Sequence, residues 1–364
     1  MRILVTGSAG HLGEALVRTL QNTEHEVVAL DILASPFTNR VGSITDHLFV
    51  RQCMEGVDAV LHTATLHKPH VGTHTRQAFV DTTIKGTLTL LEAAAAESVK
   101  AFIFTSTTST FGDALTPTAG APAAWITESV TPVAKNIYGV TKRAAEELCE
   151  LFYRNRGLPC LVLRTSRFFP EADDQKEMRE SYPDENIKAN EYLYRRVELE
   201  DVVSAHLLAL EKAATLGFGR YIISATTPFS QDELHELRMN APLIVQRHFP
   251  DYVADYARRG WKMFPSIDRV YVNERARQVL GWQPRYDFGY VLERLRAGQA
   301  PRSALARAVG AKGYHARPFE FEEGPYPLSE GALERNGERW SNDSISSDEG
   351  STKPGASGST QVRG

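Results

Sequence analysis

Short, uncharged apolar runs alternate with longer amphipathic stretches through the first half of the chain. The runs predict strands buried on both faces, because such strands lack polar–apolar alternation. We expect these strands at residues 3–5, 27–30, 57–62, 102–105 and 160–164. Apolar residues at helical spacing predict helices at 14–20, 47–54, 77–97 and 138–156. This alternation predicts an α/β fold with a Rossmann-like, doubly wound parallel sheet.

A glycine-rich turn follows the first predicted strand. Gly7, Gly10 and Gly13 recur every third residue before the first helix. Taken alone, the three glycines are equally well explained as a loop. In a dinucleotide site, however, the first allows the tight turn, the second lets a pyrophosphate approach, and the third lets the helix pack. The free N–H groups at the helix N-terminus then bind the phosphates.

Asp31 ends the second predicted strand, eighteen residues after Gly13. An acid near this spacing is expected to bond the ribose hydroxyls of NAD and to repel the extra phosphate of NADP. Arg40 keeps NADP open as the alternative, because a nearby basic side chain can accept that phosphate. We expect a dinucleotide site that prefers NAD.

The second half of the chain changes character after residue 170. Residues 171–196 are rich in charge, and residues 227–295 mix short helical patterns with proline and aromatic residues. We therefore expect a smaller C-terminal substrate-binding domain. The predicted division is an NAD-binding domain at 1–170 that 202–226 rejoins, a substrate-binding region at 171–201 and 227–330, and a disordered tail at 341–364.

Composition narrows the class of protein. The 364 residues are 42% hydrophobic, which is enough to bury a large core and suggests about two domains. A net charge of −4 without a basic stripe argues against a nucleic-acid partner. No apolar run reaches membrane-spanning length. The three cysteines lack CxxC spacing, which favours reduced, buried thiols in a cytoplasmic protein, and we expect no signal peptide.

Four of the eleven histidines lie close together, in or beside residues 64–75. They are His62, His67, His70 and His74. Imidazole is a common metal ligand, so a metal site is one interpretation. No cysteine or carboxylate cluster accompanies these histidines, and a proline and a glycine make the segment a loop. We favour a loop that faces the substrate or solvent, and we expect no metal.

Tyr138 and Lys142 lie four residues apart on a predicted helix and therefore share a face. A free tyrosine has a pKa of about 10, too high for a base near neutrality. A nearby ammonium group favours the phenolate and lowers that pKa. The hydroxyl run at 106–109 ends a predicted strand and offers a side chain to hold a reacting oxygen. An ordinary surface pair is the alternative, which the glycine turn and Asp31 make less favourable.

Together these motifs resemble the extended short-chain dehydrogenase/reductase superfamily, in particular its NAD-dependent epimerase/dehydratase family. The resemblance covers about residues 1–300. It rests on residues 6–13, 61–64, 86–87, 90–93, 105–112, 138–142 and 163–164, with a closing signature at 280–284.

The resemblance implies roles for individual residues. The catalytic residues would be Thr107, Tyr138 as general acid/base, and Lys142 as its electrostatic partner. The cofactor would be NAD, bound by Gly7, Gly10, His11, Leu12, Gly13, Asp31, Ser43, Ile44, Thr63, Ala64, Thr83, Tyr138, Lys142 and Thr165. We assign substrate contacts to His67, Lys68, Thr108, Ser109 and Arg167.

Departures from the family pattern reduce the number of reactions that we expect this chain to catalyse. Dehydratases and decarboxylases of this family place acidic residues just after the catalytic threonine, where this chain has Thr108 and Ser109. Neither side chain is a carboxylate acid or base, so we disfavour both reactions. Residues 166–171 lack the family's Gly-Pro, and 194–197 only loosely resemble its diphosphate-binding segment. Whether the substrate is nucleotide-linked stays open.

The sequence thus predicts an NAD-dependent oxidoreductase or epimerase that acts on a secondary alcohol of a sugar or nucleotide-sugar-like small molecule. A non-catalytic NAD-binding sensor or scaffold is the alternative, since fold alone does not establish function. We expect no membrane partner. A homodimer is expected to form through the predicted helices at 77–97 and 138–156.

Overall fold

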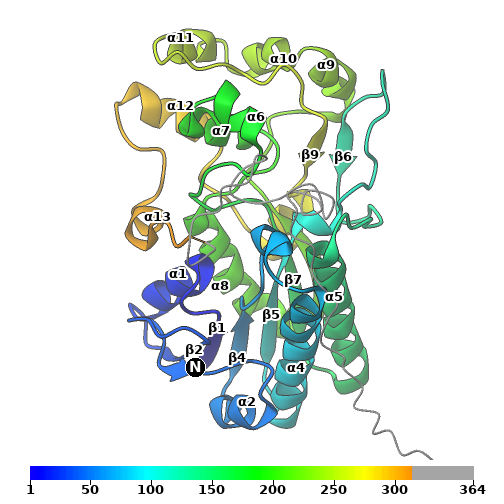
Figure 1. The fold of residues 1–364 in the computed structure, drawn as a ribbon, viewed down its shortest axis with the longest axis vertical. Helices are drawn as coiled ribbons and strands as arrows, with labels where there is room; N and C mark the ends of the chain where they lie inside the picture. Colours follow the sequence, from blue (N-terminus) through cyan, green and yellow to red (C-terminus); the bar gives the residue numbers. More distant parts are fainter. Residues whose placement is uncertain (314–364) are drawn as a thin grey trace, which may run out of the picture.

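Seven parallel strands form the central sheet of the computed structural model, which describes residues 1–313 (Figure 1). Their order is β3-β2-β1-β4-β5-β7-β8. The strands are β1 (Arg2–Thr6), β2 (Glu26–Asp31), β3 (Arg40–Val41), β4 (Ala59–His62), β5 (Ala101–Thr107), β7 (Cys160–Thr165) and β8 (Phe218–Ile223). The predicted α/β fold with a doubly wound parallel sheet is confirmed.

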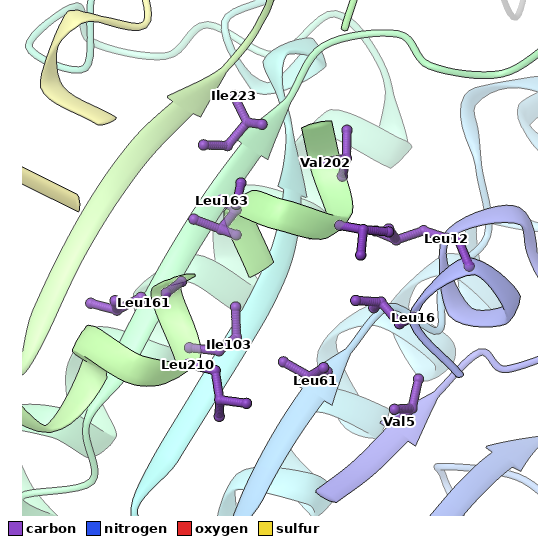
Figure 2. Packing of buried hydrophobic residues seen from close by; sticks show 14 of the residues in the cluster. Val5, Leu12, Leu16, Leu61, Ile103, Leu161, Leu163, Val202, Leu210 and Ile223 are labelled. Atoms are coloured by element: carbon purple, nitrogen blue, oxygen red, sulfur yellow. The ribbon is translucent and has the colours of Figure 1, made fainter. Parts of the chain in front are cut away.

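Helices cover both faces of this sheet. On one face lie α1 (His11–Leu20), α8 (Leu199–Leu216) and α13 (Ala304–Val309). On the other lie α2 (His47–Met54), α4 (Gly86–Ala96) and α5 (Ile137–Arg156). Figure 2 shows the first face, where Leu16 and Val202 from the helices belong to the same cluster as Leu61 and Leu163 on the sheet. Buried strands need apolar side chains on both sides, which explains their uninterrupted apolar runs.

The predicted helix at 77–97 is divided into three segments. They are α3 (Arg76–Phe79), a π-helical segment η2 (Val80–Lys85) and α4. Residues 80–85 contain β-branched side chains, which lose rotamer freedom in a helix, and a π-helical turn inserts an extra residue into the ladder. The insertion changes which side chains share a face, so simple 3.6-residue periodicity fails here.

The segment at 113–136 contains a short strand that the sequence did not predict. This strand, β6 (Ala124–Ile126), pairs in parallel with β9 (Arg269–Tyr271) in a separate two-stranded sheet. Three residues are too few for alternation to be visible in the sequence, and the partner strand is far away along the chain. The pair lies beside the C-terminal helices in Figure 1.

The C-terminal region is built from short helices with a hydrophobic core of their own. They are α6 (Lys176–Ser181), α7 (Asp184–Glu191), α9 (Leu234–Met239), α10 (Ala241–His248), α11 (Tyr252–Ala257) and α12 (Phe288–Arg296). Further short turns are η1 (Lys68–Gly72), η3 (Thr108–Thr110), η4 (Gln231–Glu233) and the π-helical η5 (Ala276–Leu280). The division into two domains stays a prediction, and the predicted tail at 341–364 lies outside the described residues.

The three cysteines, Cys53, Cys149 and Cys160, are buried and unpaired. This agrees with the sequence-based expectation of buried thiols. Within residues 1–313, no helix is long and apolar enough to cross a membrane.

Asp201 on α8 fastens the C-terminal region to the Rossmann domain. Its carboxylate is buried and accepts hydrogen bonds from the backbone N–H groups of Arg285 and Tyr286, each at 2.9 Å. The indole N–H of Trp282 donates to the Asp201 carbonyl at 3.1 Å. The 280–284 signature therefore docks on α8 through buried polar contacts as well as apolar packing.

Replacing Asp201 by alanine leaves two backbone N–H groups without an acceptor, and that of Tyr286 is buried. We expect Asp201→Ala to lower the free energy of unfolding by about 2–3 kcal/mol, measured by urea denaturation. Glu211→Ala, an exposed acid on the same helix, is the control and should change the free energy by less than about 0.5 kcal/mol. An equal decrease in the free energy of unfolding in the two variants would contradict the proposed role of the Asp201 hydrogen bonds.

Candidate active site

A cavity of about 1260 Å³ opens where β1, β4, β5 and β7 end. Ligands of open α/β sheets bind at this edge, outside the carboxyl ends of the strands. Every residue assigned from the sequence lines the cavity except Thr83. The structure therefore brings together the glycine turn, the hydroxyl-rich end of β5 and the start of α5.

The glycine turn has the geometry of a dinucleotide cradle. Gly7 has a φ of 73°, a conformation that favours glycine. A Cβ atom on Gly13 would lie 1.9 Å from the Gly7 carbonyl oxygen, so only glycine lets α1 begin this close to β1. Gly10 caps α1 without a side chain, which leaves the first N–H groups of the helix open toward the cavity. These residues fit a diphosphate.

Asp31 lies at the end of β2 on the wall of the cavity. Its carboxylate accepts hydrogen bonds from the backbone N–H groups of Ala9 and Leu33, each at 2.9 Å, so its orientation is fixed. Arg40, the residue that kept NADP open, is exposed and is not among the residues that line the cavity. This arrangement fits a ribose with free hydroxyls rather than a ribose phosphate.

The sequence-based assignment of Thr83 to the cofactor site needs correction, because Thr83 does not line the cavity. It is buried within η2, and its hydroxyl has no hydrogen-bond partner in the structure. Its neighbour Thr82 lines the cavity instead. The π-helical turn shifts the helical phase by one position, which the sequence motif alone does not reveal.

Thr107, Tyr138 and Lys142 meet at the end of β5. The hydroxyl groups of Tyr138 and Thr107 are hydrogen-bonded, and Thr107 Oγ1 also accepts from the Ser109 N–H at 3.1 Å. Lys142 Nζ donates to the Thr105 carbonyl at 2.8 Å. Asn136 caps α5 by accepting the Gly139 N–H, which sets the helix start and places Tyr138 in its first turn.

The pKa of Tyr138 differs from the sequence-based expectation. Burial raises it to about 12, and the hydrogen bond from Thr107 only partly opposes this rise. We expected Lys142 to lower it, but the Lys142 ammonium is held by the Thr105 carbonyl. Burial also lowers the pKa of Lys142 to about 7, against the opposing effect of Glu146. Desolvation is therefore the largest influence on the pKa of each group.

The other hydroxyl groups of the 106–110 run have different partners. Ser106 donates to the buried Glu146 carboxylate, and Thr110 donates to the Thr107 carbonyl at 2.9 Å. Thr108 and Ser109 line the cavity beside the catalytic group. Thr107 is thus the member of the run that pairs with Tyr138, as its position in the motif suggested.

The histidines separate into structural and cavity-lining members. His62 is buried between the hydroxyls of Thr6 and Thr87, at 2.7 and 3.0 Å. His67 lines the cavity, edge-on to Phe169, with its ring centre 6.4 Å from that of Tyr138. Burial lowers the pKa of His67 well below 6.5, so this side chain is neutral at neutral pH. Within residues 1–313, no group of three or more His, Cys, Asp or Glu side chains is arranged to hold a metal.

An ionic network lines another part of the cavity wall. Lys68 pairs with Asp174 at 2.7 Å, and Arg167 pairs with Asp174 at 3.0 Å and with Asp173. Arg167 also pairs with the buried Glu191 at 3.1 Å. Lys68 and Arg167 therefore reach the cavity with their charges already balanced by carboxylates.

Several cavity residues were not found from the sequence. They are Phe169, Glu171, Asp173, Asp174, Arg195, Tyr271, Lys312 and Gly313. The charge-rich segment at 171–196 was noted, but composition does not say which charges face a cavity. Lys312 and Gly313 follow the last family motif, so no pattern pointed to them.

Comparison with known proteins gives a consistent result. The sequence model of the NAD dependent epimerase/dehydratase family matches residues 3–223. The chain is 27% identical to a UDP-glucose 4-epimerase of Rhizobium meliloti (strain 1021), over 80% of this chain and 94% of that protein. It is 28% identical to an uncharacterized UDP-glucose epimerase, YtcB, of Bacillus subtilis (strain 168), over 45% of this chain and 55% of that protein.

Solved structures share the fold. A UDP-glucose 4-epimerase of Thermotoga maritima with UDP-glucose aligns with a TM-score of 0.55 and 24% identity, over 82% of this chain and 99% of that chain. At this identity the likeness shows the fold alone.

Two glycine substitutions should distinguish a glycine needed for cofactor binding from a glycine needed for stable folding. A Cβ on Gly10 lies 3.2 Å from the Gly7 carbonyl oxygen, so Gly10→Ala should keep its Tm within about 2 °C. It should nevertheless weaken NAD binding by about tenfold or more, because the methyl group occupies the path of the diphosphate. Gly13→Ala should lower the Tm by about 5 °C or more.

Thermal unfolding and calorimetric titration with NAD measure the two effects. A Gly10→Ala protein with wild-type NAD affinity would contradict the proposed position of the diphosphate.

Proposed function

The chain belongs to the NAD-dependent epimerase/dehydratase family, and on that premise we propose that it oxidises a secondary alcohol of a sugar or nucleotide sugar by hydride transfer to its cofactor, NAD. The observation that carries this proposal is the pair of Thr107 and Tyr138, which line one cavity together with Lys142. The pair lies in the same cavity as the glycine turn and Asp31. A binding-only protein has no need of this buried pair.

In the proposed mechanism, Tyr138 removes the proton of the substrate hydroxyl. Thr107, already bonded to the Tyr138 hydroxyl, orients the reacting oxygen. The C–H electron pair leaves as hydride, which NAD accepts when bound, and a carbonyl group forms. Lys142, one helical turn from Tyr138, stabilises the phenolate while it is protonated. We assign it a second contact, to the hydroxyls of the nicotinamide ribose.

The residues after Thr107 favour epimerisation or simple oxidation. Thr108 and Ser109 occupy the positions where an elimination reaction in this family uses carboxylates. The nearest buried carboxylate on α5, Glu146, is bonded to Ser106 and Arg164 and is not part of the cavity lining. An epimerase returns the hydride to the other face of the carbonyl, and the UDP-glucose 4-epimerases similar to this chain support this outcome.

The substrate contacts are proposed for the part of the cavity lined by residues 67–68, the turn after β5 and the residues after β7. His67, Lys68 and Arg167 line it together with Thr108 and Ser109. A neutral imidazole and two hydroxyl groups suit the hydroxyl groups of a sugar ring, because each can donate or accept a hydrogen bond. The paired Lys68 and Arg167 provide a polar wall with little uncompensated charge.

Replacing Tyr138 by phenylalanine tests the proposal. The reaction rate should fall by about 10³-fold, because the substrate hydroxyl loses its base while NAD binding is preserved. NADH formation and epimer formation are measured with UDP-glucose, UDP-galactose and the corresponding free sugars. Tyr153→Phe, on an exposed face of the same helix, is the matched control and should retain wild-type rates.

Full turnover by Tyr138→Phe would refute the mechanism. Tight NAD binding without reaction on any of these substrates would favour the sensor alternative.

We also propose that the chain forms a homodimer through α4 and α5 and that it is cytoplasmic. The two helices pack beside each other on the same face of the sheet, and α5 leaves Val140 and Leu151 exposed. Exposed apolar side chains on adjacent helices are suited to a self-complementary interface.

Light scattering should give the mass of two chains for the wild type. Val140→Glu should shift it toward the mass of one chain, because a charge enters the apolar contact. Met239→Glu, at an exposed apolar position on α9, should leave the mass unchanged. A monomeric wild type would contradict the proposed dimer.

A further inference from the structure

The chain beyond α12 returns to the cofactor end of the Rossmann domain. Helix α13 packs against α1 and α8, on the lower left of the C-terminal region in Figure 1. Ser303 caps α13 by accepting the Ala306 N–H, and its own N–H donates to Glu198 at 2.9 Å. Val309 is buried against the same core. These contacts hold α13 in place independently of the residues that follow it.

Lys312 and Gly313 then reach the rim of the cavity beside Gly10 and His11. Their backbone N–H groups donate to the Glu171 carboxylate at 3.0 and 3.2 Å. The same Glu171 oxygen lies 2.8 Å from His11 Nε2. Three segments far apart in the sequence therefore meet above the first turn of α1.

Two carboxylates stand close to this helix N-terminus. Glu14 lies in the first turn of α1 and its side chain is only 4% exposed. Glu171 is nearby. Burial acts to raise the pKa of Glu171, but the hydrogen bond with His11 lowers it, and the net pKa is lowered. The Glu171 carboxylate is therefore charged at neutral pH. A dinucleotide brings two negative phosphates to the same place. Uncompensated, these carboxylates would repel it.

The Lys312 ammonium is paired with the Glu14 carboxylate. Glu14 also pairs with Arg18 at 2.7 Å, one helical turn further along α1. Arg18 is absent from the cavity lining, whereas Lys312 is part of it. Of the two cations paired with Glu14, Lys312 is therefore the one that lines the cavity.

We propose that Lys312 is a cofactor-binding residue and that Lys312–Gly313 closes the diphosphate end of the NAD site. The ammonium group balances Glu14 and attracts the phosphates, while the backbone bonds to Glu171 keep the segment across the first turn of α1. This inference rests on NAD binding and not on the proposed reaction. It also gives the C-terminal extension after the 280–284 signature a function at the cofactor.

Calorimetric titration of the full-length protein tests the proposal. Lys312→Met should raise the Kd for NAD and for ADP-ribose by about tenfold, because a charge-assisted contact with the diphosphate is lost. It should leave the Kd for adenosine, which has no phosphate, unchanged. Arg307→Met, which removes an exposed cation from α13, is the matched control and should bind all three compounds like the wild type.

A second substitution separates electrostatics from folding. Glu14→Gln combined with Lys312→Met should recover part of the lost NAD affinity, since removing the Glu14 carboxylate restores the net charge of the Glu14, Arg18 and Lys312 cluster. NAD affinity within twofold of the wild type in Lys312→Met would overturn the proposal. So would an equal loss for adenosine and NAD, which would indicate a distorted fold. A wild-type chain that does not bind NAD would contradict the cofactor assignment itself.

Discussion

The catalytic arrangement depends on one buried ion pair beneath it. Glu146 follows Tyr138 and Lys142 at intervals of four residues on α5, so the three side chains share a face of the helix. Its carboxylate is fully buried and receives two N–H groups of Arg164, at 2.6 and 3.0 Å, from β7, and the Ser106 hydroxyl from β5. Burying a charge is costly unless it is paired and hydrogen-bonded. The observed register of α5 against the sheet satisfies Glu146 with partners from two strands.

That register explains why the two ends of the cavity have different physical character. Backbone geometry defines the cofactor end, where the close approach of Gly13 to Gly7 sets the start of α1. Side-chain charge defines the substrate end, where Lys68, Arg167 and the acids of 173–174 compensate one another. Backbone geometry changes little among proteins that bind the same cofactor, whereas a network of side chains changes with a few substitutions. Under the proposed function, substrate selectivity depends on this charged network rather than on the glycine turn.

The sequence predicted the features that depend on local pattern. The strands carry uninterrupted apolar runs, and the glycine turn, Tyr138 and Lys142 have fixed spacings, so the fold and most cavity residues followed from them. The assignment of Thr83 to the cavity failed because a π-helical turn shifts the helical phase. Strand β6 was missed because three residues show no periodicity. Lys312 was missed for a different reason. Its position depends on the packing of α13 against α1, which is a contact between the two ends of the described chain.

The expectation about the Tyr138 pKa was wrong because it considered one charge and ignored burial. Burial raises the pKa of Tyr138 to about 12 and lowers that of Lys142 to about 7, so each neutral form is favoured when the two are considered separately. A phenolate beside an ammonium is a different case, because each charge then offsets the desolvation cost of the other. The two groups are therefore best treated as a single titrating unit. In the proposed mechanism the Tyr138 phenolate forms near the Lys142 ammonium, so the charge of Lys142 matters at the step in which the proton moves.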